Sequence, residues 1–174
     1  MLATYISFFV QSITHPQNIY ELVLKHRQFL FFFSFFMNFL LLFRFGLPAA
    51  GFILFYEFSK FYYFGDRFLG EAFVIYAMVY LFGLVWHKLQ EKNLSVIDYV
   101  FAAILSCFII FIREPYALAA LLIYLFLLLD KKFSKAKFLS LSIFIILTVV
   151  LVKSVNFEEF IFNVVTVNHQ TIFA

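Results

Sequence analysis

Charged residues divide most of this chain into six long apolar blocks, and this pattern limits the folds that it can adopt. Hydrophobic residues make up 65% of the chain and charged residues 13%, whereas soluble domains contain about 45–50% apolar and about 25% charged residues. A soluble protein of this composition would expose large apolar patches and aggregate. The chain is therefore predicted to be an integral membrane protein. The blocks cover residues 28–43, 47–62, 69–86, 95–112, 116–129 and 138–152.

Each apolar block is predicted to form a helix, because lipid leaves exposed backbone groups without hydrogen-bond partners. No block alternates polar and apolar residues over the length of a strand. We therefore expect an all-α, polytopic transmembrane helix bundle of about six spans. Several blocks fall short of the roughly 20 residues that a spanning helix needs. The second block, which Pro48 and Gly51 interrupt, could instead be re-entrant or interfacial.

Residues expected to begin or end helices stand between the blocks. Gly46 and Pro48 separate the first two blocks, Ser95 is a candidate N-cap for the fourth, and Pro115 suits the first turn of the fifth. Within the first block, Asn38 lies among phenylalanines. It is predicted to form a hydrogen bond to another helix.

The two ends of the chain differ from the bundle, which is expected over residues 28–153. In residues 1–27, a short apolar stretch ends at His15 and Pro16, and the sequence NIYELVLKHRQ follows. This sequence is typical of an amphipathic helix, so we place it at the membrane surface. Residues 154–174 are of mixed composition and are predicted to be an extracytoplasmic segment. Their abrupt end suggests that the chain is a piece of a longer protein.

Charge and cysteine content exclude several classes of function and suggest an orientation. The net charge of +3 is spread along the chain, which argues against nucleic-acid binding. The only cysteine, Cys107, excludes an internal disulfide and a multi-cysteine zinc site. Four lysines are concentrated in the short DKKFSKAK loop. We assign this loop to the cytoplasmic side of a plasma or inner membrane, because basic residues in short loops favour that side.

The segment at residues 61–71, FYYFGDRFLGE, is the first candidate site. It joins two blocks and contains Asp66, Arg67 and Glu71. Two carboxylates at a membrane surface could hold a divalent cation, Mg²⁺ or Mn²⁺, because such cations prefer oxygen ligands and bridge phosphates. The alternative is a solvated loop in which Asp66 and Arg67 pair with each other.

A second candidate site lies where the fourth block meets the fifth, at Arg113, Glu114 and Pro115. The planar guanidinium group of an arginine can pair with two oxygens of a lipid phosphate at once. The alternative is a turn that simply ends the fourth helix. The four histidines, in contrast, share no metal-ligand spacing, and we interpret them as interfacial residues: His15, His26, His87 and His169.

The order of these features resembles a known enzyme superfamily. Residues 40–89, LLLFRFGLPAAGFILFYEFSKFYYFGDRFLGEAFVIYAMVYLFGLVWHKL, and residues 101–132, FAAILSCFIIFIREPYALAALLIYLFLLLDKK, are similar in hydropathy and punctuation to the C-type glycosyltransferases. These multi-pass enzymes, such as the protein O-mannosyltransferase and lipid A aminoarabinose transferase families, use polyprenyl-phosphate-linked sugars. The resemblance covers roughly residues 28–153.

The resemblance implies part of a membrane glycosyltransferase that moves a sugar from a polyprenyl-phosphate donor to an acceptor at the extracytoplasmic face. It implies that Asp66 and Glu71 are catalytic or metal-binding, and that Arg67 and Arg113 contact the donor phosphate. The family's usual catalytic aspartate follows the first span, and no aspartate precedes Asp66 here. This fragment is therefore expected to be inactive alone.

A non-catalytic polytopic protein, such as a transporter piece or an envelope-assembly subunit, is the alternative function. A transporter is expected to place charged or polar residues inside its spans. The predicted spans of this chain are nearly free of charge, which favours a site at the membrane surface.

Overall fold

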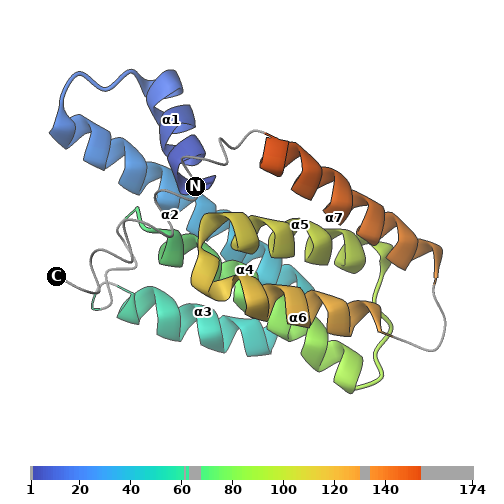
Figure 1. The fold of residues 1–174 in the computed structure, drawn as a ribbon. Helices are drawn as coiled ribbons and strands as arrows, with labels where there is room; N and C mark the ends of the chain where they lie inside the picture. The colour runs from blue at the N-terminus through green and yellow to red at the C-terminus, as the bar shows by residue number, and fades with distance from the viewer. Residues whose placement is uncertain (1, 61, 63–67, 130–133, 154–174) are drawn as a thin grey trace, which may run out of the picture.

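The computed structural model describes residues 2–60, 62, 68–129 and 134–153, and all regular secondary structure in this part of the chain is helix (Figure 1). The predicted all-α fold is confirmed. The predicted C-terminal segment, residues 154–174, lies outside the described residues. The elements are α1 (Leu2–Thr14), α2 (Ile19–Phe45), α3 (Leu47–Ser59), α4 (Gly70–Leu89), α5 (Val96–Ile112), the 3₁₀ helix η1 (Glu114–Tyr116), α6 (Ala117–Leu128) and α7 (Lys135–Lys153).

Three of these helices, α2, α4 and α7, are long and apolar enough to cross a membrane. The other apolar helices that coincide with predicted blocks, α3, α5 and α6, are shorter. Length and composition therefore support a membrane protein, with three candidate spanning helices in the part of the chain that the structure describes. That the three shorter helices also span the membrane stays a prediction.

The helix boundaries follow the local signals in the sequence. Gly46 has a φ of 65° and separates α2 from α3, whose first turn contains Pro48. Ser95 caps α5 by accepting a hydrogen bond from the backbone of Asp98, whose side chain accepts one from the Ser95 backbone in return. Pro115 lies in the first turn of η1. The turn residues predicted at these three places are confirmed.

Helix α2 differs from the sequence-based expectation, because it runs without a break from Ile19 to Phe45. The expected surface helix and the first apolar block are thus one helix, and residue 28 is not a helix boundary. Lys25, Arg27 and Gln28 interrupt the hydrophobicity of this stretch but not its helix propensity, since all three residue types favour helices. Pro16, in contrast, follows the end of α1 as expected.

Successive helices from α2 to α7 run in alternate directions, so the bundle has two distinct ends (Figure 1). At one end, which we call the Asp98 end, α2, α4 and α6 finish, and α3, α5 and α7 begin. At the opposite end, which we call the Arg113 end, α3 and α5 finish, and α4 begins. Helices α4 and α5 lie at the centre: α5 packs against α4, α6 and α7, and α4 also packs against α2.

Small side chains line the central contacts and let the helices approach closely, as is common in membrane bundles. The buried alanines include Ala72, Ala77, Ala102, Ala103 and Ala120. Large apolar side chains face outward instead on the peripheral helices, as lipid contact requires. They include Phe31, Phe32, Phe35, Phe36 and Phe39 of α2, Leu54, Phe55 and Phe58 of α3, and Ile145, Ile146, Val149 and Val150 of α7.

We predict that Ala103→Leu destabilises the bundle by about 1–3 kcal/mol, the usual cost of overpacking a close-packed interior. Ala103 is 0% exposed. Gly51→Leu introduces the same side chain on α3, where an added Cβ meets no atom within 4 Å, and should not destabilise. Unfolding of both variants in mixed detergent and dodecyl sulfate measures the difference. Equal stability of the two variants would contradict the central position of α5.

Candidate functional site

Two of the four predicted site residues, Glu71 and Arg113, meet at the Arg113 end of the bundle. Glu71 lies in the first turn of α4, and Arg113 is the residue that follows α5. Arg113 Nε donates a hydrogen bond to Glu71 Oε1 at 2.8 Å, and Arg113 Nη2 lies 2.6 Å from the same oxygen. The Glu71 side chain is 45% exposed and the Arg113 side chain is 47% exposed. A carboxylate and a guanidinium group therefore stand together in an accessible position.

The backbone around this pair explains why the two helices meet there. A Cβ at Gly70 would lie 3.3 Å from Arg113 Cδ and 3.4 Å from the Ile112 carbonyl oxygen. Glycine thus lets the beginning of α4 lie against the end of α5. Arg113 is extended, with φ −152° and ψ 108°, and its N–H closes the last turn of α5 on Ile109. A carboxylate in the first turn of a helix is also favoured by the helix dipole.

The other two predicted site residues, Asp66 and Arg67, lie outside the described residues. Phe68, the next described residue along the chain, is held by aromatic contacts. Its ring stacks on His26 of α2 with a centroid distance of 4.2 Å and meets the edge of Phe73 of α4 at 5.1 Å. His26 also makes a hydrogen bond to Ser7 of α1 at 3.0 Å. These contacts hold Phe68, two residues before α4, beside α2.

The divalent-cation site predicted at Asp66 and Glu71 includes a residue that the structure does not describe. Over the described ranges, no group of three or more histidine, cysteine, aspartate or glutamate side chains could hold a metal ion. Of the two predicted carboxylate ligands, only Glu71 can be placed.

A polar cluster inside the bundle was not singled out from the sequence. It consists of Asn38, Glu57, Lys60 and Tyr76, and we call it the Glu57 cluster. Asn38 Nδ2 and the Tyr76 hydroxyl donate to Glu57 Oε1 at 2.8 and 2.7 Å, and Lys60 pairs with Glu57 Oε2. The cluster joins α2, α3 and α4. The predicted interhelical hydrogen bond of Asn38 is thereby confirmed.

Sequence spacing carries a signal for the Glu57 cluster. Asn38 lies eight residues before Gly46, and Glu57 lies eleven residues after it. In two antiparallel helices that leave one turn, such positions lie within about one helical turn of the same depth, so the two side chains can meet. Asn38 Oδ1 is also buried and has no hydrogen-bond partner among the residues described.

The Asp98 end is held by a second pair that the sequence did not reveal as a contact. Arg44 Nε donates to Asp98 Oδ1 at 2.6 Å and Arg44 Nη2 to Oδ2 at 2.8 Å, which ties α2 to α5. The Ser95 backbone N–H and hydroxyl donate to the same carboxylate. Asp98 is only 1% exposed. The pair is thus a buried structural link rather than an accessible site.

Lys88 stabilises the Asp98 end in a different way. Its ammonium group donates to the carbonyl oxygens of Phe126 and Leu127 at 2.7 and 3.1 Å, and to that of Leu129. These carbonyls belong to the end of α6, where backbone acceptors lack partners within the helix. Lys88 therefore caps α6 from α4.

Comparisons with known proteins add no family to this description. No protein-family model, curated protein or solved structure matches the chain. Its function must be inferred from its own residues and their geometry.

We predict that Asp98→Asn lowers the free energy of unfolding by about 2 kcal/mol, because hydrogen bonds to charged groups contribute about 1.5–3 kcal/mol. Asparagine keeps the size of the side chain and can still accept from Ser95. Arg44→Gln should cost a similar amount, and the double variant should cost less than the sum of the two. Glu91→Gln, an exposed change at the same end, is the control. Additive effects in this double-mutant cycle would refute the link.

Proposed function

We propose that this chain is part of an integral membrane glycosyltransferase that moves a sugar from a polyprenyl-phosphate donor to an acceptor at the extracytoplasmic face. The observation that carries the proposal is the Glu71–Arg113 pair. A carboxylate suited to general base catalysis and a guanidinium group suited to a phosphate stand side by side at one end of an apolar bundle. The resemblance of residues 28–153 to the C-type glycosyltransferases agrees with this pairing of roles.

The proposed reaction is a single inverting displacement. Glu71 accepts the proton of the acceptor hydroxyl, whose oxygen forms a bond to the anomeric carbon of the sugar. The bond from that carbon to the phosphate oxygen breaks, and polyprenyl phosphate leaves with the electron pair. Arg113 holds the leaving phosphate. Because Arg113 contacts Glu71 in this structure, the arriving phosphate would draw Arg113 away and release the carboxylate.

Asp66 and Arg67 belong to the same proposal, as a second carboxylate and a second contact to the donor phosphate. A cation, Mg²⁺ or Mn²⁺, is proposed only together with Asp66, because Glu71 is the one predicted ligand that the structure describes. Such a cation would stabilise the negative charge of the leaving phosphate.

The side of the membrane follows from the lysine-rich loop. Lys137, at the end of DKKFSKAK, lies 5.9 Å from the ring of Tyr99 in the first turn of α5, at the Asp98 end. Glu71 and Arg113 are at the opposite end. If basic residues in short loops mark the cytoplasmic side, the proposed site faces the extracytoplasmic side, where lipid-linked sugars are used in this superfamily.

We predict that Glu71→Gln in the full-length protein lowers sugar transfer by at least about 100-fold, the scale of a lost general base. Glu114→Gln, an exposed change next to Arg113, is the matched control and should retain activity. Arg113→Lys should weaken retention of polyprenyl phosphate, because lysine lacks the planar fork. Transfer from radiolabelled polyprenyl-phosphate hexoses in membrane vesicles measures both effects. Wild-type rates for Glu71→Gln would end the proposal.

Transport is the second candidate function, and the Glu57 cluster favours it. Ionisable residues within membrane helices are expensive to bury and commonly mark ion or proton pathways. Glu57 lies within α3 and is bonded to side chains of α2 and α4. The sequence-based expectation that the spans are nearly free of charge therefore has an exception at this position.

A proton pathway through Glu57 predicts proton flux into vesicles that contain the purified chain, driven by an imposed membrane potential. Glu57→Gln should abolish the flux, since the neutral amide cannot carry a proton. Glu91→Gln, an exposed change at the Asp98 end, should leave the proton flux unchanged. A pH-sensitive dye inside the vesicles measures the flux, and equal traces with and without wild-type protein would exclude this function.

A further inference from the structure

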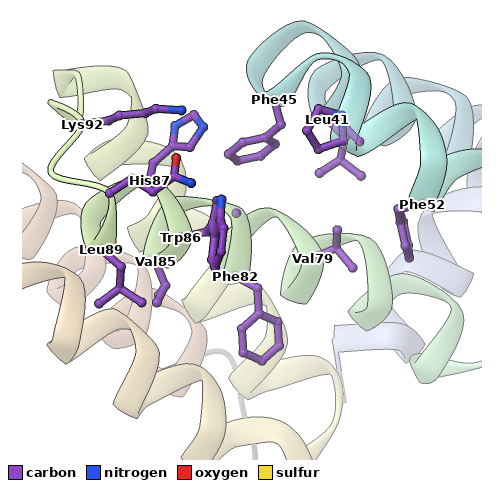
Figure 2. A pocket seen from close by; sticks show the side chains of 14 residues that line it. Leu41, Phe45, Phe52, Val79, Phe82, Val85, Trp86, His87, Leu89 and Lys92 are labelled. Atoms are coloured by element: carbon purple, nitrogen blue, oxygen red, sulfur yellow. The ribbon is translucent and has the colours of Figure 1, made fainter.

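A groove of about 700 Å³ lies between α3 and α4 toward the Asp98 end (Figure 2). Pro48, Ala49 and Phe52 form its α3 side, and Leu41 and Phe45 of α2 line it as well. Toward the Arg113 end, α3 and α4 are joined by the hydrogen bond from Tyr76 to Glu57. The volume is within the range of about 300–1,000 Å³ that is common for small-molecule sites.

The α4 side of the groove is apolar along most of its length. It is formed by Val79, Phe82, Gly83 and Trp86. An added Cβ at Gly83 would lie 2.5–2.9 Å from atoms of the Phe45 ring, so glycine allows that ring to lie against α4. Phe82 and Trp86 are exposed on the outer face of α4. This lining suits a hydrocarbon chain.

Polar residues are confined to one end of the groove, where α4 finishes. His87, Gln90 and Lys92 line this end, and Figure 2 shows the Lys92 side chain extending beside the His87 ring. Lys92 forms no ion pair with the residues described. Trp86 lies beside this end, and tryptophan is enriched at the level of lipid headgroups. The groove thus matches an amphipathic molecule with an apolar tail and an anionic head.

We propose that this groove binds an anionic glycerophospholipid from the leaflet at the Asp98 end, with an acyl chain along α3 and α4 and the headgroup phosphate at Lys92. Charge complementarity and the confinement of polar groups to one end favour a lipid over a protein. This site lies away from Glu71 and Arg113 and is independent of the proposed transferase activity.

The test uses the full chain purified in mild detergent, with phosphatidylglycerol and phosphatidylcholine of identical acyl chains as the probes. Native mass spectrometry counts the lipids that stay bound to each variant. Wild-type protein should retain phosphatidylglycerol in preference to phosphatidylcholine. Lys92→Gln should lower phosphatidylglycerol retention about fivefold, the change expected for one lysine at an anionic membrane surface. Lys135→Gln removes a charge at the same end from an exposed position outside the groove and should have no effect.

A second pair of variants tests the place of the acyl chain. Pro48→Phe adds a ring at an exposed position of the α3 wall of the groove and should lower retention of both lipids, whereas Gly51→Phe adds the same ring to α3 at a site with open space around it and should not. Equal effects of Lys92→Gln and Lys135→Gln would overturn the proposal. Equal retention of the two lipids by wild-type protein would also overturn it. So would mass spectra that show two copies of the chain bound to each other without lipid.

Discussion

Ion pairs and hydrogen bonds between side chains inside the apolar bundle fix how the helices lie against one another. Arg44 and Asp98 join α2 to α5, and the bonds to Glu57 join α2, α3 and α4. Apolar packing alone is poorly directional among helices that lipid surrounds, since lipid tails are as apolar as the side chains. The polar contacts therefore select one arrangement among many that would bury similar surface.

Much of the fold could be predicted because its signals are local. Gly46, Ser95 and Pro115 end or begin helices through their own backbone conformation or capping bonds, so their effect can be predicted from the sequence. No helix begins at residue 28, where the first apolar block was expected to begin, and the reason is instructive. Lys25 and Arg27 change the hydropathy at that point, yet both residues favour helix. Hydropathy marks where a helix meets lipid, and it does not mark where the helix begins.

The candidate site could be predicted only in part. Glu71 and Arg113 were each noticed as charges at span ends, and alternating helix directions bring such ends together. Their direct contact also depends on the close approach of the α4 and α5 backbones at Gly70, which no spacing rule supplies. The links of Arg44 to Asp98 and of Asn38 to Glu57 depend on which helices are neighbours. Neighbours in a helical bundle are set by packing between distant segments.

The two arginine–carboxylate pairs are chemically alike, but burial gives them opposite roles. Asp98 is 1% exposed and accepts from Ser95 as well as Arg44, so removing Arg44 leaves a buried carboxylate without its cation, at a cost of about 1.5–3 kcal/mol. Glu71 and Arg113 are nearly half exposed, and exposed pairs contribute only about 0–1 kcal/mol. A phosphate could therefore replace Glu71 beside Arg113 at little cost to the fold. The Arg113 end is the one that can exchange partners, while the Asp98 pair keeps α2 and α5 in place.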